Sequence, residues 1–385
     1  MFRFLTSGES HGKGLTAIVE GVPAGLRLDE DFIAHDLKRR QGGYGRGSRQ
    51  RIEHDRAEIL SGVRHGVTMG SPITLVIWNR DWDNWETAMS VSPVEGDTKR
   101  ITRPRPGHAD LAGVTKYALD DVRPILERAS ARETAARVAA GGVARRFLEE
   151  FSIEIHSHTL AIGGEWAKVA TPVDWQQVES SLVRCADSIE EKGMMVAIEE
   201  AVGSGDTVGG VSEVVAFGVP VGLGNHIQWD RRLDGRIAQA MMSIQSVKGM
   251  EIGDAFKAVD ERGSQVHDGI EMSDKAAYPW QRQSNRAGGI EGGISNGEPI
   301  VLRLAVKPIP TLAKPLPSVD LATGESVLAH FERSDVCVVP AVGVIGEAML
   351  AMVLADAVLE KFGGDSMGET RRNFEGYLKS IGGAH

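Results

Sequence analysis

The sequence predicts a mixed α+β protein that folds as a single compact domain over residues 1–385. Three observations support this class. Segments rich in β-branched residues are interspersed with helical segments, without the regular alternation of a doubly wound parallel sheet. No Gly-x-Gly-x-x-Gly motif follows a predicted strand, which disfavours a dinucleotide-binding fold. No low-complexity linker divides the chain into separate domains.

The first predicted elements lie in the N-terminal quarter of the chain. Residues 15–19 and 72–78 have the length and β-branched content of strands. Residues 29–41 predict a helix for which Asp29 is the N-cap. The glycines within residues 42–45 end this helix and open a loop that carries arginines.

Ser130 and Glu133 have the Ser-x-x-Glu spacing of a capping box, which predicts an alanine-rich helix running to about residue 150. Further elements follow this helix. Strands are predicted at 151–162 and 211–221, helices at 231–246 and 341–362, and a long polar loop at 256–285. The helix at 341–362 is nearly all apolar, so we expect it to be buried.

Composition limits the classes of function. No apolar run approaches the roughly 18 residues that a membrane helix needs, and the N-terminus lacks the pattern of a signal peptide. We therefore expect a cytoplasmic protein without a membrane partner. Cys185 and Cys337 lie too far apart to suggest a disulfide framework or a metal motif. The net charge of −10 disfavours general binding to nucleic acid.

Positive charge is nevertheless concentrated in two stretches. Residues 38–52 carry six Lys or Arg residues, and residues 98–109 carry a further group that includes His108, with no acidic residue in either stretch. Concentrated positive charge on an acidic protein indicates a small, confined anionic ligand. A pair of solvated basic loops is the alternative that the charges alone leave open.

Two histidines are candidates for proton transfer. His11 lies in Gly-Glu-Ser-His-Gly and His108 in Pro-Gly-His-Ala-Asp, and histidine titrates near neutral pH. Each could instead be a hydrogen-bonded structural histidine. His156 and His158 are predicted to lie on the surface of a strand, and no histidine spacing resembles a zinc site.

Three further motifs are compatible with an anionic ligand. Arg128 precedes the capped helix, whose free N–H groups could bind phosphate, although Arg128 could also be a surface charge. The double glycines of residues 288–293 allow a flat ligand to approach the backbone, and prolines extend residues 307–311. Arg333 and Asp335 pair a cation with a carboxylate, which could also be an ordinary surface ion pair.

These motifs together resemble the chorismate synthase family along essentially the whole chain. The resemblance covers seven ordered motifs, which are residues 8–12, 39–46, 105–110, 128–134, 242–246, 288–293 with 307–311, and 333–337. It implies a β-α-β sandwich and a homotetramer. It also implies elimination of phosphate from 5-enolpyruvylshikimate 3-phosphate to give chorismate, with reduced FMN (FMNH2) as cofactor.

The resemblance assigns roles residue by residue. His11, His108 and Asp335 match the family's proton-handling positions, and Arg40 and Arg46 match positions for anionic substrate or NADP. The residues that match flavin contacts are Arg128, Ala129, Ser130, Gln245, Ser246, Gly292, Lys307, Pro308, Ile309, Pro310, Thr311 and Arg333.

Two rival functions remain open at this point. A flavin-dependent oxidoreductase acting on a phosphorylated small molecule would share the flavin and arginine contacts but consume NAD(P)H with each product. The resemblance favours NADPH only as an indirect reductant, with a separate flavin reductase. Nucleic-acid binding would require aromatic residues beside the arginines, and the first basic stretch has only Tyr44.

Overall fold

The computed structural model describes residues 1–47, 52–96, 100–273, 278–332 and 334–382. Its first sheet is antiparallel, with the strand order β1-β2-β6-β3. Leu15, Ala17 and Val19 of β2 are buried and alternate with more exposed residues, so one face of this sheet packs on the core. The strands are β1 (Arg3–Ser7), β2 (Gly14–Glu20), β3 (Glu58–Ile59) and β6 (Ile73–Trp78), which confirms the strands predicted at 15–19 and 72–78.

The second sheet is also antiparallel, with the order β10-β15-β9-β7-β8. The predicted strands at 151–162 and 211–221 are both present but shorter than expected. The strands are β7 (Glu154–Ile162), β8 (Glu165–Trp166), β9 (Gly210–Phe217), β10 (Val247–Ile252) and β15 (Ile300–Val306).

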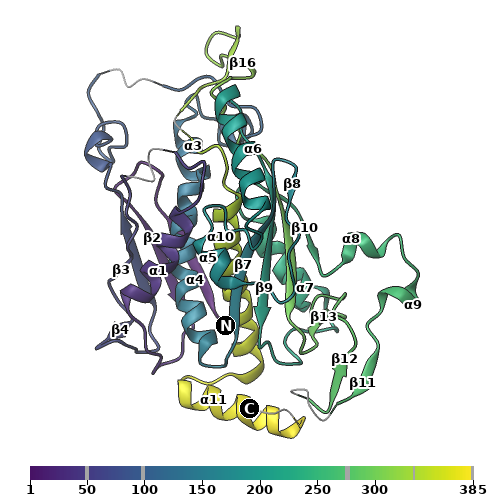
Figure 1. Cartoon of the computed structure of the whole chain (residues 1–385). Helices are drawn as coiled ribbons and strands as arrows, with labels where there is room; N and C mark the ends of the chain where they lie inside the picture. The colour runs from purple at the N-terminus through teal and green to yellow at the C-terminus, as the bar shows by residue number, and fades with distance from the viewer. Residues whose placement is uncertain (48–51, 97–99, 274–277, 333, 383–385) are drawn as a thin grey trace.

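Two long helices fill the space between the sheets (Figure 1). α4 (Thr134–Glu149) packs on β2 and β6, α10 (Val339–Phe362) packs on β7 and β9, and the two helices pack on each other. Glycine permits this close approach, since a Cβ added at Gly141 would lie 2.3 Å from the Cβ of Ala348. The arrangement confirms the expected β-α-β sandwich.

α10 begins two residues before the predicted helix and, as expected, is buried along nearly its whole length. By length and composition alone it could cross a membrane, which corrects the expectation that no segment approaches that requirement. However, 89% of its most apolar window is buried inside the fold. α10 is therefore the central helix of the hydrophobic core that joins both sheets.

The helix predicted at 29–41 is α1 (Glu30–Gln41), and Asp29 caps it by accepting a hydrogen bond from the backbone N–H of Phe32. Of the capping box predicted at Ser130 and Glu133, the cap by Ser130 is present but the reciprocal contact of Glu133 is not. Ser130 accepts from the N–H of Arg132 and begins a short 3-10 turn before α4. The Glu133 carboxylate binds Thr6 and Arg137 instead, because tertiary partners compete for it.

Other helices lie around the sandwich. The helix predicted at 231–246 is shorter than expected, because residues 229–231 form a 3-10 turn and α7 ends at Met242. These helices are α2 (Asp110–Tyr117), α3 (Arg123–Ala129), α5 (Trp175–Ser180), α6 (Glu190–Ser204), α7 (Leu233–Met242) and α11 (Met367–Ser380).

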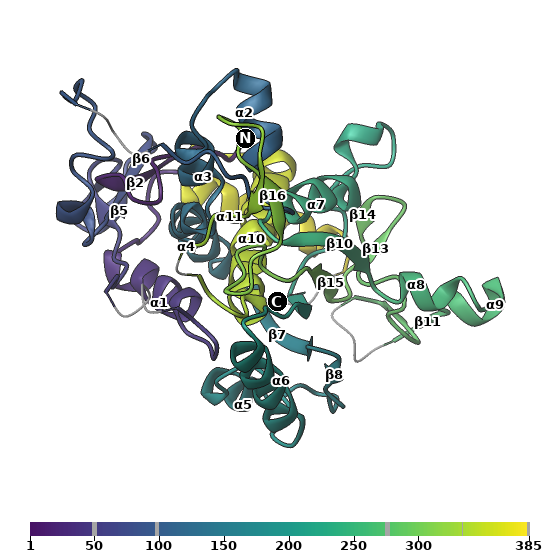
Figure 2. The ribbon, with the colours of Figure 1, turned by 90° about the horizontal axis from the view of Figure 1, so that it is seen from above.

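The prediction of a long loop at 256–285 is wrong for the described part of that segment. Two short helices and a β-hairpin form an arm that extends away from the second sheet in both views (Figures 1 and 2). Because the residues of β11 are all exposed and those of β12 are all partly buried, neither strand has the alternating burial that makes a strand visible in sequence. The arm contains α8 (Ala255–Ala258), α9 (Gly263–Val266), β11 (Ile270–Met272) and β12 (Trp280–Arg282).

Three small hairpins complete the described structure, namely β4 (Val63–Arg64) with β5 (Val67–Thr68), β13 (Ile290–Glu291) with β14 (Ile294–Ser295), and β16 (Pro317–Val319) with β17 (Ser326–Leu328).

The prediction that His158 lies on the surface is wrong. His158 is 1% exposed, and its Nε2 lies 3.0 Å from Oε1 of Glu213. Trp175 of α5 packs edge-on against the ring and covers this face of β7. The sequence of β7 alone could not show that a helix distant in the chain covers it.

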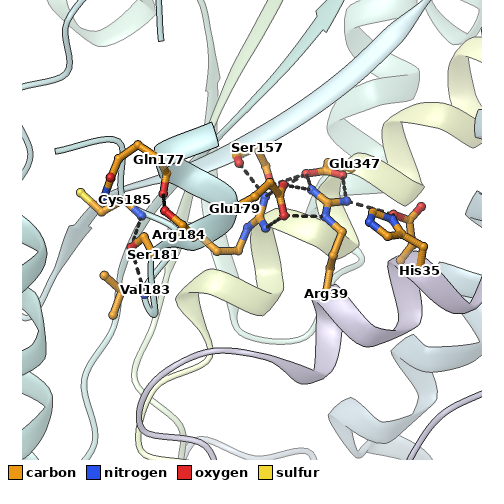
Figure 3. Close-up of polar contacts among 12 residues, drawn as sticks. His35, Arg39, Ser157, Gln177, Glu179, Ser181, Val183, Arg184, Cys185 and Glu347 are labelled. Carbon is orange, nitrogen blue, oxygen red and sulfur yellow. Dashed lines mark hydrogen bonds and ion pairs between the residues drawn. The ribbon is translucent and has the colours of Figure 1, made fainter. Parts of the chain in front are cut away.

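A buried cluster of charges ties α1 to α10 (Figure 3). Glu347 of α10 is fully buried and accepts hydrogen bonds from Arg39, Arg145 and Ser157. Arg39 also contacts Glu179, which binds Arg184. This cluster holds the C-terminal turn of α1, which leads directly into the arginine-bearing loop.

Candidate active site

A cavity of about 750 Å³ opens at one end of the sandwich, within the usual size range of small-molecule sites. It is formed where several segments distant in sequence meet. These are the β1–β2 loop, the end of α1, the 105–109 segment, the turn between α3 and α4, the α7–β10 turn, the segment after β15, and the approach to α10.

His11 lies in the β1–β2 loop and lines this cavity. Its Nδ1 lies 2.9 and 3.1 Å from the two carboxylate oxygens of Glu127, and its ring stacks on Trp85 at 3.8 Å. Burial works to raise the pKa of Glu127, but hydrogen bonds and charge from His11 and Arg123 hold it below its ordinary value. Glu127 is therefore a carboxylate, and Nδ1 of His11 donates to it.

His108 lines another part of the cavity and is held by a second carboxylate. Its Nδ1 lies 2.5 Å from Oδ1 of Asp110, which also binds Arg105 through two guanidinium nitrogens. Burial would raise the pKa of Asp110, but hydrogen bonds from His108 and Arg105 lower it well below its ordinary value. Both predicted histidines thus have a fixed ring orientation at the cavity wall.

Asp335 lies just before α10 and also faces the cavity. Its Oδ1 accepts a 2.6 Å hydrogen bond from the backbone N–H of Gly47, and its Oδ2 lies 3.1 Å from Nη1 of Arg46. The pair is largely buried, with 8% of the Arg46 side chain and 16% of the Asp335 side chain exposed. Asp335 is thus paired with Arg46, while the alternative of a surface ion pair with Arg333 involves a residue outside the described part of the chain.

Arg40 lines the cavity but is not a mobile loop residue. It belongs to the last turn of α1, is 3% exposed, and donates to Thr134, Asp55 and the carbonyl of Ala131. Burial lowers its pKa to about 10, although Asp55 opposes that shift. Its charge persists at neutral pH, and three of its five N–H donors are already engaged by the protein.

Most of the residues expected to contact a flavin meet at the same cavity. Ser246 has a φ of 72°, a conformation that costs a non-glycine residue about 1–3 kcal/mol and is often found at functional sites. Its carbonyl accepts from the N–H of Lys307, whose side chain binds the carbonyl of Gly107. The predicted flavin contacts that line the cavity are Ala129, Ser130, Gln245, Ser246, Lys307, Ile309, Pro310 and Thr311.

Four predicted contacts lie elsewhere or cannot be placed. Arg128 donates to the carbonyls of Thr6 and Gly8 and does not line the cavity. Gly292 lies in the turn between β13 and β14, and neither it nor Pro308 is part of the lining. Arg333 lies outside the described residues.

The cavity has the chemical character of a site for a flat, anionic cofactor. Its wall combines apolar side chains with cations, and two of its polar atoms have no partner among the described residues, Oε1 of Gln245 and Nε of Arg46. Buried polar atoms are normally satisfied, so these two fit a bound polar ligand. Among the described residues, no cluster of His, Cys, Asp or Glu could hold a metal ion.

Sequence reasoning missed several residues that shape the site. Arg132 lines the cavity and is held by Asp55 and Asn79. Glu127 and Trp85 hold His11 but belong to no motif identified in the sequence. Glu127 directly precedes Arg128, which lies in a motif. That position alone could not predict its contact with His11, which is 116 residues away in sequence.

Comparisons with known proteins show the family of this chain. The family model described as chorismate synthase matches residues 2–359. The chorismate synthase of Desulforudis audaxviator is 57% identical over 99% of this chain and 98% of its own length. That of Geobacter sulfurreducens is 55% identical over 99% of both chains.

A crystal structure of a chorismate synthase superimposes with a TM-score of 0.79 at 47% sequence identity, covering 99% of this chain and 98% of the other. Sequence and fold therefore agree over nearly the full length of both chains. The chain belongs to the chorismate synthase family.

Proposed function

We propose that the described cavity is where this chain eliminates phosphate from 5-enolpyruvylshikimate 3-phosphate to form chorismate. This carbon–oxygen lyase reaction, with reduced flavin, is the reaction of the family. The observation that supports the location is the meeting of His11, His108 and Asp335 in one cavity with several cationic side chains. The three residues come from segments far apart in sequence.

Substrate binding rests on fixed positive charge. Arg46, Arg105 and Lys307 line the cavity, and the side chains of Arg46 and Arg105 are largely buried. Cations in such an environment stabilise a departing phosphate far better than they would in bulk water. Arg40 contributes its positive charge, while three of its five N–H donors bind the protein itself.

Proton handling is divided between the two histidines and the aspartate. His11, whose Nδ1 is held by Glu127, protonates the departing phosphate through Nε2 as a general acid. His108, oriented by Asp110, holds a proton at the cofactor, and Asp335 assists removal of the proton from C6 of the substrate. Reduced FMN, when bound, supplies electron density for the elimination and undergoes no net oxidation.

The residues that would hold the flavin are the eight predicted contacts of the cavity wall, with Arg128, Pro308 and Gly292 as further candidates from its margins or from another subunit. Arg333, which the resemblance also assigns to the flavin, lies outside the described residues. We further propose that NADPH acts only as an indirect reductant through a separate flavin reductase. We also propose that the protein is cytoplasmic and assembles as a homotetramer.

The experiment is anaerobic incubation of the protein with dithionite-reduced FMN and 5-enolpyruvylshikimate 3-phosphate. Chorismate and free phosphate should appear together in equal amounts. A parallel reaction with oxidised FMN should give neither product, and static light scattering should report a tetramer. Absence of chorismate with reduced flavin bound would exclude the proposed reaction.

A further inference from the structure

Glu127 of α3 holds the β1–β2 loop at two adjacent residues, Ser10 and His11. The backbone carbonyl of Glu127 accepts from the N–H of Ser10 at 3.1 Å, and its side chain accepts from the N–H of His11 at 2.7 Å. The same carboxylate then binds Nδ1 of the His11 ring. Glu127 thus fixes both the backbone and the side chain of His11.

Two further contacts restrict the imidazole. The Trp85 ring lies 3.8 Å from it in a stacked arrangement, with 22° between the planes. Arg123 donates to Glu127 at 3.0 Å and is also paired with Glu332 at 2.9 Å. The Glu127 side chain is completely buried, so its charge is balanced by these neighbours rather than by water.

From this geometry we infer that Glu127 is the positioning residue for His11, which it holds with the proton on Nδ1 and Nε2 directed to the reacting groups. An ionised carboxylate only accepts hydrogen bonds, so it selects the Nδ1–H tautomer of a neutral ring. After His11 gives up its Nε2 proton, the ring is left in that same tautomer and needs no rearrangement before it is protonated again. The inference rests on the proposed role of His11 as general acid.

The arrangement has the logic of a catalytic histidine oriented by a buried carboxylate, in which an incorrect tautomer lowers turnover while the geometry is retained. The role of the histidine differs from its role in a hydrolase triad. Here it donates a proton to the phosphate, and no nucleophile is involved. Glu127 itself does not touch the substrate. Its effect should therefore appear in kcat and in the state of the His11 ring.

The test is Glu127→Gln, which keeps the size of the side chain but can donate to Nδ1 as well as accept from it. With reduced FMN supplied, kcat for chorismate formation should fall at least about tenfold, while KM for the substrate and Kd for flavin change by less than about threefold. In ¹⁵N spectra of histidine-labelled protein, assigned with His11→Ala, the neutral ring of His11 should change from Nδ1–H to a mixture of tautomers.

Glu150→Gln is the matched control, because it also removes a paired carboxylate but far from the cavity, where Glu150 binds Arg146 and Arg371. It should leave kcat and the His11 spectrum unchanged. Glu127→Asp, whose carboxylate is one methylene shorter, should retain more of the Nδ1–H tautomer and more turnover than Glu127→Gln.

The two proposals can fail separately. If the wild-type protein forms no chorismate, the proposed function is wrong, but the ¹⁵N spectra still decide whether Glu127 sets the tautomer. If the enzyme is active and Glu127→Gln changes only thermal stability, with the kcat and the tautomer of the wild type, then Glu127 is a structural residue and the inference is wrong.

Discussion

Arg39 and Glu347 lie 308 residues apart in sequence and are joined by two parallel hydrogen bonds of 2.6 and 2.8 Å. The side chain of Glu347 is fully buried, and that of Arg39 is 9% exposed. The bidentate pair connects the central helix of the core to the helix that ends at the cavity. Burial would raise the pKa of Glu347, but Arg39 and Arg145 hold it below its ordinary value.

Glu347→Ala should strongly destabilise the fold, because it leaves Arg39, Arg145 and Arg184 buried without their shared partner. Loss of one member of a buried ion pair typically costs about 3–5 kcal/mol. Urea unfolding followed by circular dichroism measures the change. Glu375→Ala, at an exposed position of α11, is the control and should stay within about 0.5 kcal/mol of the wild type. A similarly small effect for Glu347→Ala would contradict the importance of the cluster.

The same cluster predicts how stability depends on pH. Burial would raise the pKa of Asp36, but a hydrogen bond from His35 and the charges of Arg145 and Arg39 lower it, as they do for Glu347. A carboxylate with a depressed folded-state pKa binds fewer protons than in the unfolded chain. Its contribution is therefore present above the unfolded pKa of about 4 and is lost as the pH falls below it.

Thermal unfolding at pH 7, 5, 4 and 3 should show a steep fall in Tm below pH 5. The variant Glu347→Gln should start from a lower Tm and lose less of it over the same range, because one of the linked carboxylates is gone. Equal pH dependence in the two proteins would show that other groups control acid stability.

Much of the fold was predictable because burial leaves a local pattern. Length and β-branched content marked β2 and β6 of the first sheet, alternation marked β7 of the second, and the apolar run at 341–362 marked the buried helix α10. The hairpin of the arm was not predicted because neither of its strands alternates between buried and exposed residues. His158 was misplaced because only the tertiary packing of Trp175 covers it.

The site was predictable to a similar degree, and for a different reason. His11, His108 and Asp335 stand in short glycine-bearing or charged motifs, and all three line the cavity. The roles of their partners were not predicted, although Asp110 lies within a motif, since a carboxylate that holds a histidine is indistinguishable in sequence from a solvated one. The sequence also cannot show which arginines already bind other protein groups, as Arg40 binds Thr134 and Asp55, because these contacts form only in the folded chain.

Arg46 and Arg40 should respond differently to replacement by alanine. Arg46 has a buried Nε without a partner among the described residues, so Arg46→Ala should mainly weaken substrate binding, by about 10- to 100-fold for one or two charge-assisted bonds. Arg40→Ala should also lower stability by about 1–3 kcal/mol, because Thr134 and the carbonyl of Ala131 lose a buried donor.

Steady-state kinetics and urea unfolding of both variants provide the measurement, with Arg371→Ala on the surface of α11 as the control. An Arg46→Ala enzyme with the wild-type KM would remove Arg46 from the substrate site. Equal stability of Arg40→Ala and the wild type would show that the buried contacts of Arg40 contribute nothing measurable.

Cys337 lies two residues after Asp335 but should have no part in the reaction. Burial raises the pKa of its thiol to about 11, so it stays protonated at neutral pH, and the same holds for Cys185. Cys337→Ala should therefore keep its flavin and at least half of the wild-type kcat, and the native protein should react slowly with iodoacetamide until it is unfolded. Complete loss of turnover in a folded, flavin-bound Cys337→Ala would show that the thiol is required.

The fate of the flavin separates the elimination from a redox reaction. If the cofactor donates electron density transiently and is again in its reduced form at the end of each turnover, one equivalent of reduced FMN should support many turnovers under strict exclusion of oxygen. One phosphate should be released for each chorismate formed. His11→Ala should slow phosphate release by about 10²–10⁴-fold, the usual range for a lost general acid, without preventing flavin binding. Absorbance at the flavin band, recorded alongside product formation, should show the cofactor still reduced when the substrate is consumed. An oxidoreductase acting on the same phosphorylated substrate would instead stop after one equivalent of product with its flavin oxidised, and such a burst would overturn the proposed role of the cavity residues.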